Sequence, residues 1–207
     1  MLWSRACCIS ALLQHVSSYT QLSDDALRSL PDPGNDFDIH DGALLAPILQ
    51  PRVPGTPGST AVLTHFLTFF HESLPSWNIS LQNSTATTPT SNGAEVPFVN
   101  LIATRDPPWA SPGSVGRLAL VAHYDSLQTP EGFIGATDSA APCAMVMHAA
   151  RSIDEALTAK WESMTAEGVG DGGFDGIEEH KGIQVLLLDG EEAFLSWSST
   201  DSLYGAR

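Results

Sequence analysis

The sequence predicts an α/β domain built around a parallel pair of strands. Two short, continuous apolar runs, at residues 118–122 and 183–188, each end in polar residues, which is typical of strands covered on both faces. Between them, apolar residues recur at helical spacing over residues 139–157. A strand, a crossover helix and a second strand place the two strands parallel in one sheet. We therefore expect both runs to be central strands.

The N-terminal half adds a helix and two further strands. A Pro-Gly-Thr-Pro-Gly-Ser turn at 54–59 precedes apolar residues at helical spacing, and Pro75 ends them, so we expect a helix over 59–73. Alternation at 77–81 predicts a half-exposed strand and the denser run at 98–104 a buried one, with a Thr/Ser/Asn loop between them. Polar residues at 23–41 are expected outside the core, and a Gly-rich acidic loop is expected at 167–181.

Size and charge limit the classes of function. The 207 residues, of which 43% are hydrophobic, fit one globular domain with a core. Nine basic and 24 acidic residues give a net charge of −15, which repels nucleic-acid phosphates and anionic lipid headgroups. No apolar run reaches the roughly 20 residues of a membrane-spanning helix. We expect neither a nucleic-acid nor a membrane partner, and the sequence does not indicate an oligomeric state.

Two features indicate the secretory route. Residues 1–22 have the form of a short signal peptide or leader, with Arg5 before an apolar stretch, although an ordinary amphipathic start has the same composition. Asn78 and Asn83 each begin an acceptor triplet for N-glycosylation in a polar segment. We therefore expect a secreted glycoprotein with a leader at 1–22 and one domain at 23–207.

The cysteines do not form a disulfide framework. Cys7 and Cys8 lie in the expected leader, so Cys143 would remain in a mature chain. Small apolar residues surround Cys143 in the predicted crossover helix. We expect a buried, inert thiol there rather than a nucleophile, which would need a base and a polar setting.

Three polar segments border the two predicted central strands. A His-Tyr-Asp-Ser run at 123–126 follows the first strand, Gly-Ala-Thr-Asp-Ser at 135–139 precedes the helix, and Asp-Gly-Glu-Glu at 189–192 follows the second strand. Ligands of open α/β sheets bind beyond the carboxyl ends of the strands. Taken singly, Asp138 could cap the helix, His123 could be a core residue, and Asp-Gly-Glu-Glu could be a charged turn. Together they indicate a cation site, because polar groups that lose solvent need a partner.

Zinc suits these residue types. Imidazole and carboxylate groups are common zinc ligands, and a catalytic zinc uses about three protein ligands with one open position. Successive side chains in extended backbone point to opposite sides. One carboxylate of the Glu191-Glu192 pair can therefore reach a metal while the other faces a substrate as acid or base.

The same segments resemble a known family. Residues 54–59, 123–126, 135–145 and 189–205 are similar to motifs of the glutaminyl-peptide cyclotransferases, within the zinc aminopeptidase-like M28 family. The similarity spans roughly residues 44–207. It implies a three-layer αβα fold with a central mixed, mostly parallel sheet, of which this chain would be a C-terminally truncated, N-terminal portion. The tail that follows Glu191 and Glu192 favours the cyclase branch.

Carried over by position, the resemblance implies roles for four residues. Asp138 and Glu192 would bind one zinc ion, Glu191 would act as acid and base, and Trp197 would form a wall of the substrate pocket. The implied reaction converts an N-terminal glutamine of a peptide or protein to pyroglutamate with release of ammonia. In the alternative, a two-metal zinc aminopeptidase, His123 would also bind metal.

The chain also departs from the pattern of this family. Ala122 stands where many relatives have a Cys that could pair with the one matching Cys143. The resemblance implies a further acidic residue and a third zinc ligand, a His, from segments after Arg207; His148, in the predicted helix, and His180, in the acidic loop, are not placed to replace it. The implied expectation is that these residues alone are inactive, and a non-catalytic or truncated product is the third hypothesis.

Overall fold

The computed structural model describes residues 22–111, 113–169 and 181–207. Nearly all of the expected leader at 1–22, with Cys7 and Cys8, lies outside the described residues, as do His180 and most of the expected acidic loop. The signal peptide, the domain boundary at residue 23 and the secretory route stay predictions.

The chain divides into two units after Asp32. In the described part of the first unit, Ser23 caps a short helix, α1 (Asp24–Arg28): the Ser23 hydroxyl accepts a hydrogen bond from the Ala26 amide at 3.1 Å. The second unit, Pro33–Arg207, contains the sheet, the two long helices and the candidate site.

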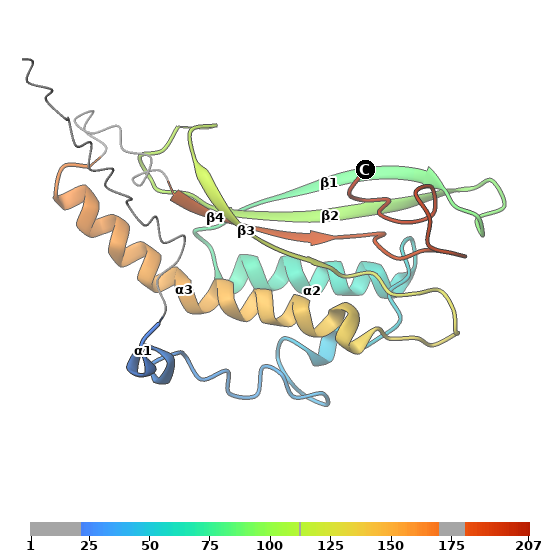
Figure 1. Cartoon of the computed structure of the whole chain (residues 1–207), viewed down its shortest axis with the longest axis horizontal. Coiled ribbons are helices and arrows are strands. Elements are labelled where there is room, and N and C mark those ends of the chain that lie inside the picture. The colour runs from blue at the N-terminus through green and yellow to red at the C-terminus, as the bar shows by residue number, and fades with distance from the viewer. Residues whose placement is uncertain (1–21, 112, 170–180) are drawn as a thin grey trace, which may run out of the picture. The chain divides into compact units, whose positions relative to one another are not determined.

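One four-stranded sheet forms the centre of the second unit (Figure 1). The strands lie in the order β1-β2-β4-β3, with β1 (Asn78–Thr87), β2 (Glu95–Arg105), β3 (Gly116–His123) and β4 (Lys181–Leu188). β3 and β4 are parallel, which confirms the predicted crossover. The pairs β1–β2 and β2–β4 are antiparallel. The sheet is mixed, as expected, but its described pairings are mainly antiparallel, because β1 and β2 form a hairpin whose second strand runs against β4.

Two helices, α2 (Pro57–Ser73) and α3 (Ala141–Ala166), cover the same face of this sheet (Figure 1). Their apolar sides meet alternate strand residues, such as Leu101 on β2 and Leu187 on β4, in the main core. A short 3-10 helix, Ala46–Ile48, contributes Ile48 to the same core. Within the described part of the second unit the long helices lie on this one face, so the second helical layer of the expected αβα fold is not among these residues.

Local sequence explains both helices. The Thr56 hydroxyl accepts a hydrogen bond from the Ser59 amide and Pro57 occupies the first turn, so α2 begins two residues before its predicted start and ends where predicted. α3 follows an irregular turn, Ala136–Ala140, and continues well past the predicted end at residue 157. Its last turns are held by Trp161, which is 4% exposed beneath the Arg105 guanidinium, 4.8 Å from the ring centre.

The predicted central position is wrong for β3. Among the described strands β4 lies between β2 and β3, whereas β3 is an edge strand with Leu118 64% and Val121 51% exposed. An apolar run shows that a strand suits burial, but it does not reveal which neighbours cover the strand.

Two other sequence expectations also need correction. Residues 82–87, expected in a Thr/Ser/Asn loop, belong to β1, because backbone pairing with β2 does not require apolar side chains. The polar stretch at 23–41 does reach the core, since Phe37 packs against it and Asp36 is 5% exposed. Of the helices that the structure describes, none has both the length and the apolar character to cross a bilayer.

Candidate metal centre at the ends of two parallel strands

The carboxyl ends of β3 and β4 lie next to each other. His123, the last residue of β3, is in register with Leu188, the last residue of β4. The Tyr124 amide then donates a hydrogen bond to the Leu188 carbonyl at 2.8 Å, so the chain leaves both strands side by side. The polar segments that follow the two strands therefore converge, as the sequence predicts.

Asp125 joins these two segments. Its side chain is fully buried, and its two carboxylate oxygens accept hydrogen bonds from successive amides, that of Glu191 at 3.0 Å and that of Glu192 at 2.9 Å. Two charge-assisted bonds of this kind fix the position of the Glu pair. The His-Tyr-Asp spacing brings Asp125 to the site, but no signal in the sequence identifies the two amides that it holds.

His123 contacts carboxylates through both ring nitrogens. Nδ1 lies 3.3 Å from Asp125 Oδ1 and Nε2 lies 2.8 Å from Asp138 Oδ1, with Glu191 Oε2 at 3.9 Å from Nε2. Burial lowers the pKa of His123, but the hydrogen bonds to Asp125 and Asp138 and the charge of Glu191 outweigh burial and raise the pKa to about 9. The raised pKa favours the protonated form of the ring, in which both nitrogens are hydrogen-bond donors.

Asp138 reaches the cluster from the irregular turn before α3. Its side chain is 74% exposed, and hydrogen bonds with His123 and Ser139 lower its pKa. The turn requires glycine at position 135, where φ is +47° and a Cβ would lie 2.4 Å from the Asp138 carbonyl oxygen. The peptide bond after Asp138 is cis.

The Glu pair faces the same region. One ligand atom from each of His123, Glu191 and Glu192 lies within 4.8 Å of the others, a spacing that one metal ion can span. Burial, and then the charge of Asp125, raises the pKa of Glu192 to about 7. Burial also raises the pKa of Glu191. A raised pKa means that the ionised form of the carboxylate is disfavoured, and a cation bound beside it would stabilise that form.

The structure therefore brings together all four predicted polar residues of the site: His123, Asp138, Glu191 and Glu192. The group of converging ligand atoms differs from the expected zinc pair in one respect, because it contains His123 and Glu191 but not Asp138. The Asp138 carboxylate is instead directed to its hydrogen bond with His123.

A further carboxylate is buried beside the pair. Asp189 is 2% exposed; its Oδ2 accepts a hydrogen bond from the Val99 amide at 3.1 Å, and its Oδ1 has no hydrogen-bond partner among the described residues. Burial, and then the charge of Asp125, raises the pKa of Asp189 to about 7. Its place in the acidic Asp-Gly-Glu-Glu run is visible in the sequence, but its burial is not.

Trp197, the expected pocket wall, lies in the segment after the Glu pair and is 57% exposed. Asp201 orders this segment, because its carboxylate accepts hydrogen bonds from the amides of Phe194, Leu195 and Ser196. The exposed indole is accessible to a ligand, and its contact with a substrate stays a prediction.

His148 and Cys143, which the sequence analysis also considered, are not among the converging ligand atoms. His148 Nδ1 pairs with Asp36 Oδ2 at 2.9 Å, so this histidine has a partner elsewhere, as expected for a helix residue away from the strand ends. Cys143 is fully buried, as expected, and its thiol donates to the His123 carbonyl at 3.1 Å. Burial raises its pKa to about 12, which agrees with the predicted inert thiol.

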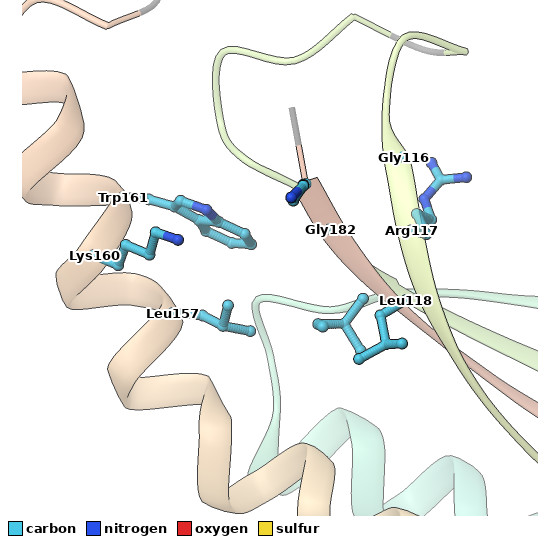
Figure 2. Close-up of a pocket in the computed structure, with 9 residues that line it drawn as sticks. Gly116, Arg117, Leu118, Leu157, Lys160, Trp161 and Gly182 are labelled. Carbon is cyan, nitrogen blue, oxygen red and sulfur yellow. The ribbon is translucent and has the colours of Figure 1, made fainter. Parts of the chain in front are cut away.

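A cavity of about 480 Å³ lies at the opposite end of β3 and β4, between their first residues and α3 (Figure 2). Leu118, Leu157 and Trp161 give it an apolar lining, and Arg117 and Lys160 add basic groups (Figure 2). No acidic residue is among the described residues that line it, so it lacks the carboxylates of a zinc site.

Known proteins are similar to this chain over the same region. Residues 100–207 match peptidase family M28. The chain is 34% identical over 166 residues to a glutaminyl-peptide cyclotransferase-like protein of Bos taurus, which covers 79% of this chain and 38% of that protein. It is 35% identical over 167 residues to a glutaminyl-peptide cyclotransferase of Bos taurus, with 79% and 41% covered. The chain thus spans about two fifths of the length of the curated relatives that it matches.

Solved structures agree with this similarity. A Macrostomum lignano glutaminyl cyclase superimposes with a TM-score of 0.65 at 29% identity, over 92% of this chain and 49% of that one. A Zn-dependent exopeptidase from Parabacteroides distasonis gives a TM-score of 0.56 at 20% identity, over 86% and 55%, and supports the fold alone. The expected α/β fold, with its open mixed sheet, is confirmed.

Proposed function

This chain belongs to peptidase family M28, and from that membership we propose that it is part of a zinc-dependent glutaminyl-peptide cyclotransferase. The active site would be the strand-end cluster, which consists of His123, Asp138, Glu191 and Glu192. The enzyme's substrates would be peptides or proteins that begin with glutamine, and its products pyroglutamate and ammonia. Support comes from relatives named glutaminyl-peptide cyclotransferase or glutaminyl-peptide cyclotransferase-like protein, at 34–36% identity over about four fifths of the chain, and from the solved glutaminyl cyclase at 29% identity.

The similarity to named relatives is the observation that carries this choice. Relatives named glutaminyl-peptide cyclotransferase, or glutaminyl-peptide cyclotransferase-like protein, are 34–36% identical to this chain, whereas the Zn-dependent exopeptidase is 20% identical and supports the fold alone. A two-metal peptidase would need His123 as a ligand, whereas a one-zinc cyclase does not. Because a ligand atom of His123 also lies near those of Glu191 and Glu192, the number of bound zinc ions separates the two enzymes.

Asp138 and Glu192 are the residues that we propose as ligands of one zinc ion. The donor set fits a zinc ion, because Glu192 lies in the group of converging ligand atoms and the Asp138 carboxylate lies 2.8 Å from His123 in the same group. Burial raises the pKa of Glu192 to about 7, and a cation beside it would stabilise its ionised form. When bound, zinc would polarise the γ-carboxamide oxygen of the substrate as a Lewis acid. Asp125 keeps Glu192 in place through the amide that it binds.

Glu191 is the proposed acid and base. The substrate's α-amine attacks the γ-carboxamide carbon, and Glu191 accepts the proton that this amine loses. The same proton then passes to the departing nitrogen as the original C–N bond breaks, and ammonia leaves. Burial raises the pKa of Glu191, which makes the carboxylate a better proton acceptor. Trp197 would pack against the substrate.

A product assay separates the hypotheses. A protein in which this chain continues into the acidic residue and the histidine that the resemblance implies after Arg207 is incubated with zinc and either a Gln-initiated or a Leu-initiated peptide, and released ammonia and free leucine are measured. We expect ammonia without leucine, and a loss of at least ~100-fold in kcat for Glu191→Gln. Release of leucine would instead support the aminopeptidase. A chain that folds and forms neither product would support the third hypothesis, a non-catalytic protein.

We also propose that the protein enters the secretory route. Asn78 and Asn83 are both exposed on β1, where a glycan would meet solvent. Expression in secreting eukaryotic cells should give a protein whose mass falls on treatment with an N-glycosidase. A mass unchanged by that treatment would contradict glycosylation.

A further inference from the structure

Arg52 is a buried cation next to the metal centre. Its side chain is 0% exposed. The guanidinium donates hydrogen bonds to backbone carbonyls of three separate segments, at Ile48 and Gln50 (both 3.2 Å), Tyr124, Ile134, and Gly135 (3.0 Å). No carboxylate is among these acceptors, although a buried arginine usually has one as a direct partner. The side chain therefore holds backbone rather than neutralising an acid.

Three of these carbonyls, those of Tyr124, Ile134 and Gly135, belong to the two segments that bear the site. Tyr124 lies between His123 and Asp125, and Gly135 begins the turn that ends at Asp138. The Arg52 backbone amide adds a third tie, since it donates to Ser126 Oγ at 3.0 Å. One residue thus fixes the spacing between the strand end and the turn.

Arginine is suited to this position in two ways. Its planar fork offers five N–H donors in fixed directions, which a lysine cannot reproduce. Burial lowers the pKa of Arg52, and the charges of nearby acids, among them Asp125 and Asp138, oppose that effect. The acids of the site thus help to keep Arg52 charged without contacting it directly.

We propose that Arg52 is a positioning residue of the metal centre, which sets the separation of the His123 and Asp138 segments and thereby the zinc affinity. It touches neither metal nor substrate. The part of this inference that concerns zinc rests on the proposed function, whereas the part that concerns the two segments does not.

The test compares Arg52→Lys with a matched variant, Arg105→Lys, at the other end of the sheet. Arg105 bonds to Asp154 at 3.2 Å and Thr158 at 2.9 Å and covers Trp161. Both substitutions keep the charge and remove the fork. Amide hydrogen exchange of the metal-free protein and zinc affinity are measured for the wild type and both variants.

For Arg52→Lys we expect faster exchange confined to residues 123–140 and 189–192, unchanged exchange in α2, and zinc affinity reduced by about 10- to 100-fold. For Arg105→Lys we expect faster exchange near residues 105 and 158–161, with zinc affinity within about twofold of the wild type. If Arg52→Lys does not fold, Arg52→Gln, which keeps two N–H donors, replaces it in the same comparison.

Exchange at 123–140 that equals the wild type would overturn the proposal. Exchange that rises evenly through the whole protein would also overturn it, because Arg52 would then stabilise the fold in general. If the wild type itself binds no zinc, the proposed zinc enzyme fails, while the exchange pattern still decides the role of Arg52.

Discussion

The two ends of β3 and β4 differ in chemistry although the same strands form both. At the carboxyl ends, His123 and several carboxylates meet, and the pKa values of Glu192 and Asp189 are raised to about 7. At the opposite ends, a cavity of about 480 Å³ has an apolar lining with basic groups (Figure 2). The cavity lies at one end and the converging reactive groups at the other. Ligand geometry and perturbed pKa values locate the candidate site better than volume does.

The balance of charge explains this contrast. At the cavity end, acids and bases pair directly: Arg117 binds Asp106 through two bonds of 2.8 and 2.6 Å, and Arg105 binds Asp154 at 3.2 Å. At the site end the acids outnumber the cations, among which are His123 and the buried Arg52. An excess of negative charge in a partly buried site favours a bound cation.

Among substitutions at the two ends of β3 and β4, Asp125→Asn is expected to have the largest effect on stability and zinc affinity. An asparagine side chain offers one oxygen and an NH₂ group, so one of the amides of Glu191 and Glu192 would face a donor instead of an acceptor. We expect a loss of about 3 kcal/mol in the free energy of unfolding, measured by urea denaturation, and a zinc affinity about 10- to 100-fold lower.

The matched substitution at the cavity end is Asp106→Asn. Asp106 pairs with Arg117, and both side chains are 30% exposed. We expect it to cost about 1 kcal/mol or less and to leave zinc affinity unchanged. Equal losses for Asp125→Asn and Asp106→Asn would contradict the distinction between the two ends.

A smaller effect is expected from Asp189→Asn, through the pH dependence of stability. The folded-state pKa of Asp189, about 7, lies above its ordinary value of 3.8. Its contribution to stability is therefore present below pH 3.8 and lost as the pH rises through 7. We expect the metal-free wild type to lose stability between pH 5 and pH 8 in urea denaturation, and Asp189→Asn to lose less. An equal loss in both proteins would show that Asp189 ionises without cost.

The smallest effect is expected from Lys160→Ala at the cavity (Figure 2). No ligand role is proposed for this residue, so stability should change by no more than about 0.5 kcal/mol and zinc affinity should not change. A clear loss of zinc affinity, measured by titration calorimetry, would connect the cavity end to the metal centre.

The elements that follow local apolar patterns were predictable from the sequence. Apolar residues recur at regular spacing in α2, β2, β4 and the first part of α3, and these residues form much of the shared core. The edge position of β3 was not predictable, because residues 118–122 have the composition of a central strand. The length of β1 was also missed, since its outer residues pair through the backbone alone.

The candidate site also has a part that the sequence predicts and a part that it does not. Its titratable residues were predictable, because polar residues that follow apolar strands gather at the strand ends. The interactions that hold them were not. Arg52 binds carbonyls 72 and 83 residues away, and Asp125 binds amides 66 and 67 residues away. Such partners depend on the assembled fold, and no local pattern encodes them.

The most direct test of the metal centre is zinc titration of the purified chain beside two single variants, Glu192→Gln and Glu191→Gln. We expect one zinc ion per wild-type chain, an affinity at least ~100-fold lower for Glu192→Gln, and little change for Glu191→Gln. These neighbouring residues have the same side chain, so each variant controls for the other. Zinc binding that survives Glu192→Gln unchanged would place the metal elsewhere and contradict the assignment of the strand-end cluster.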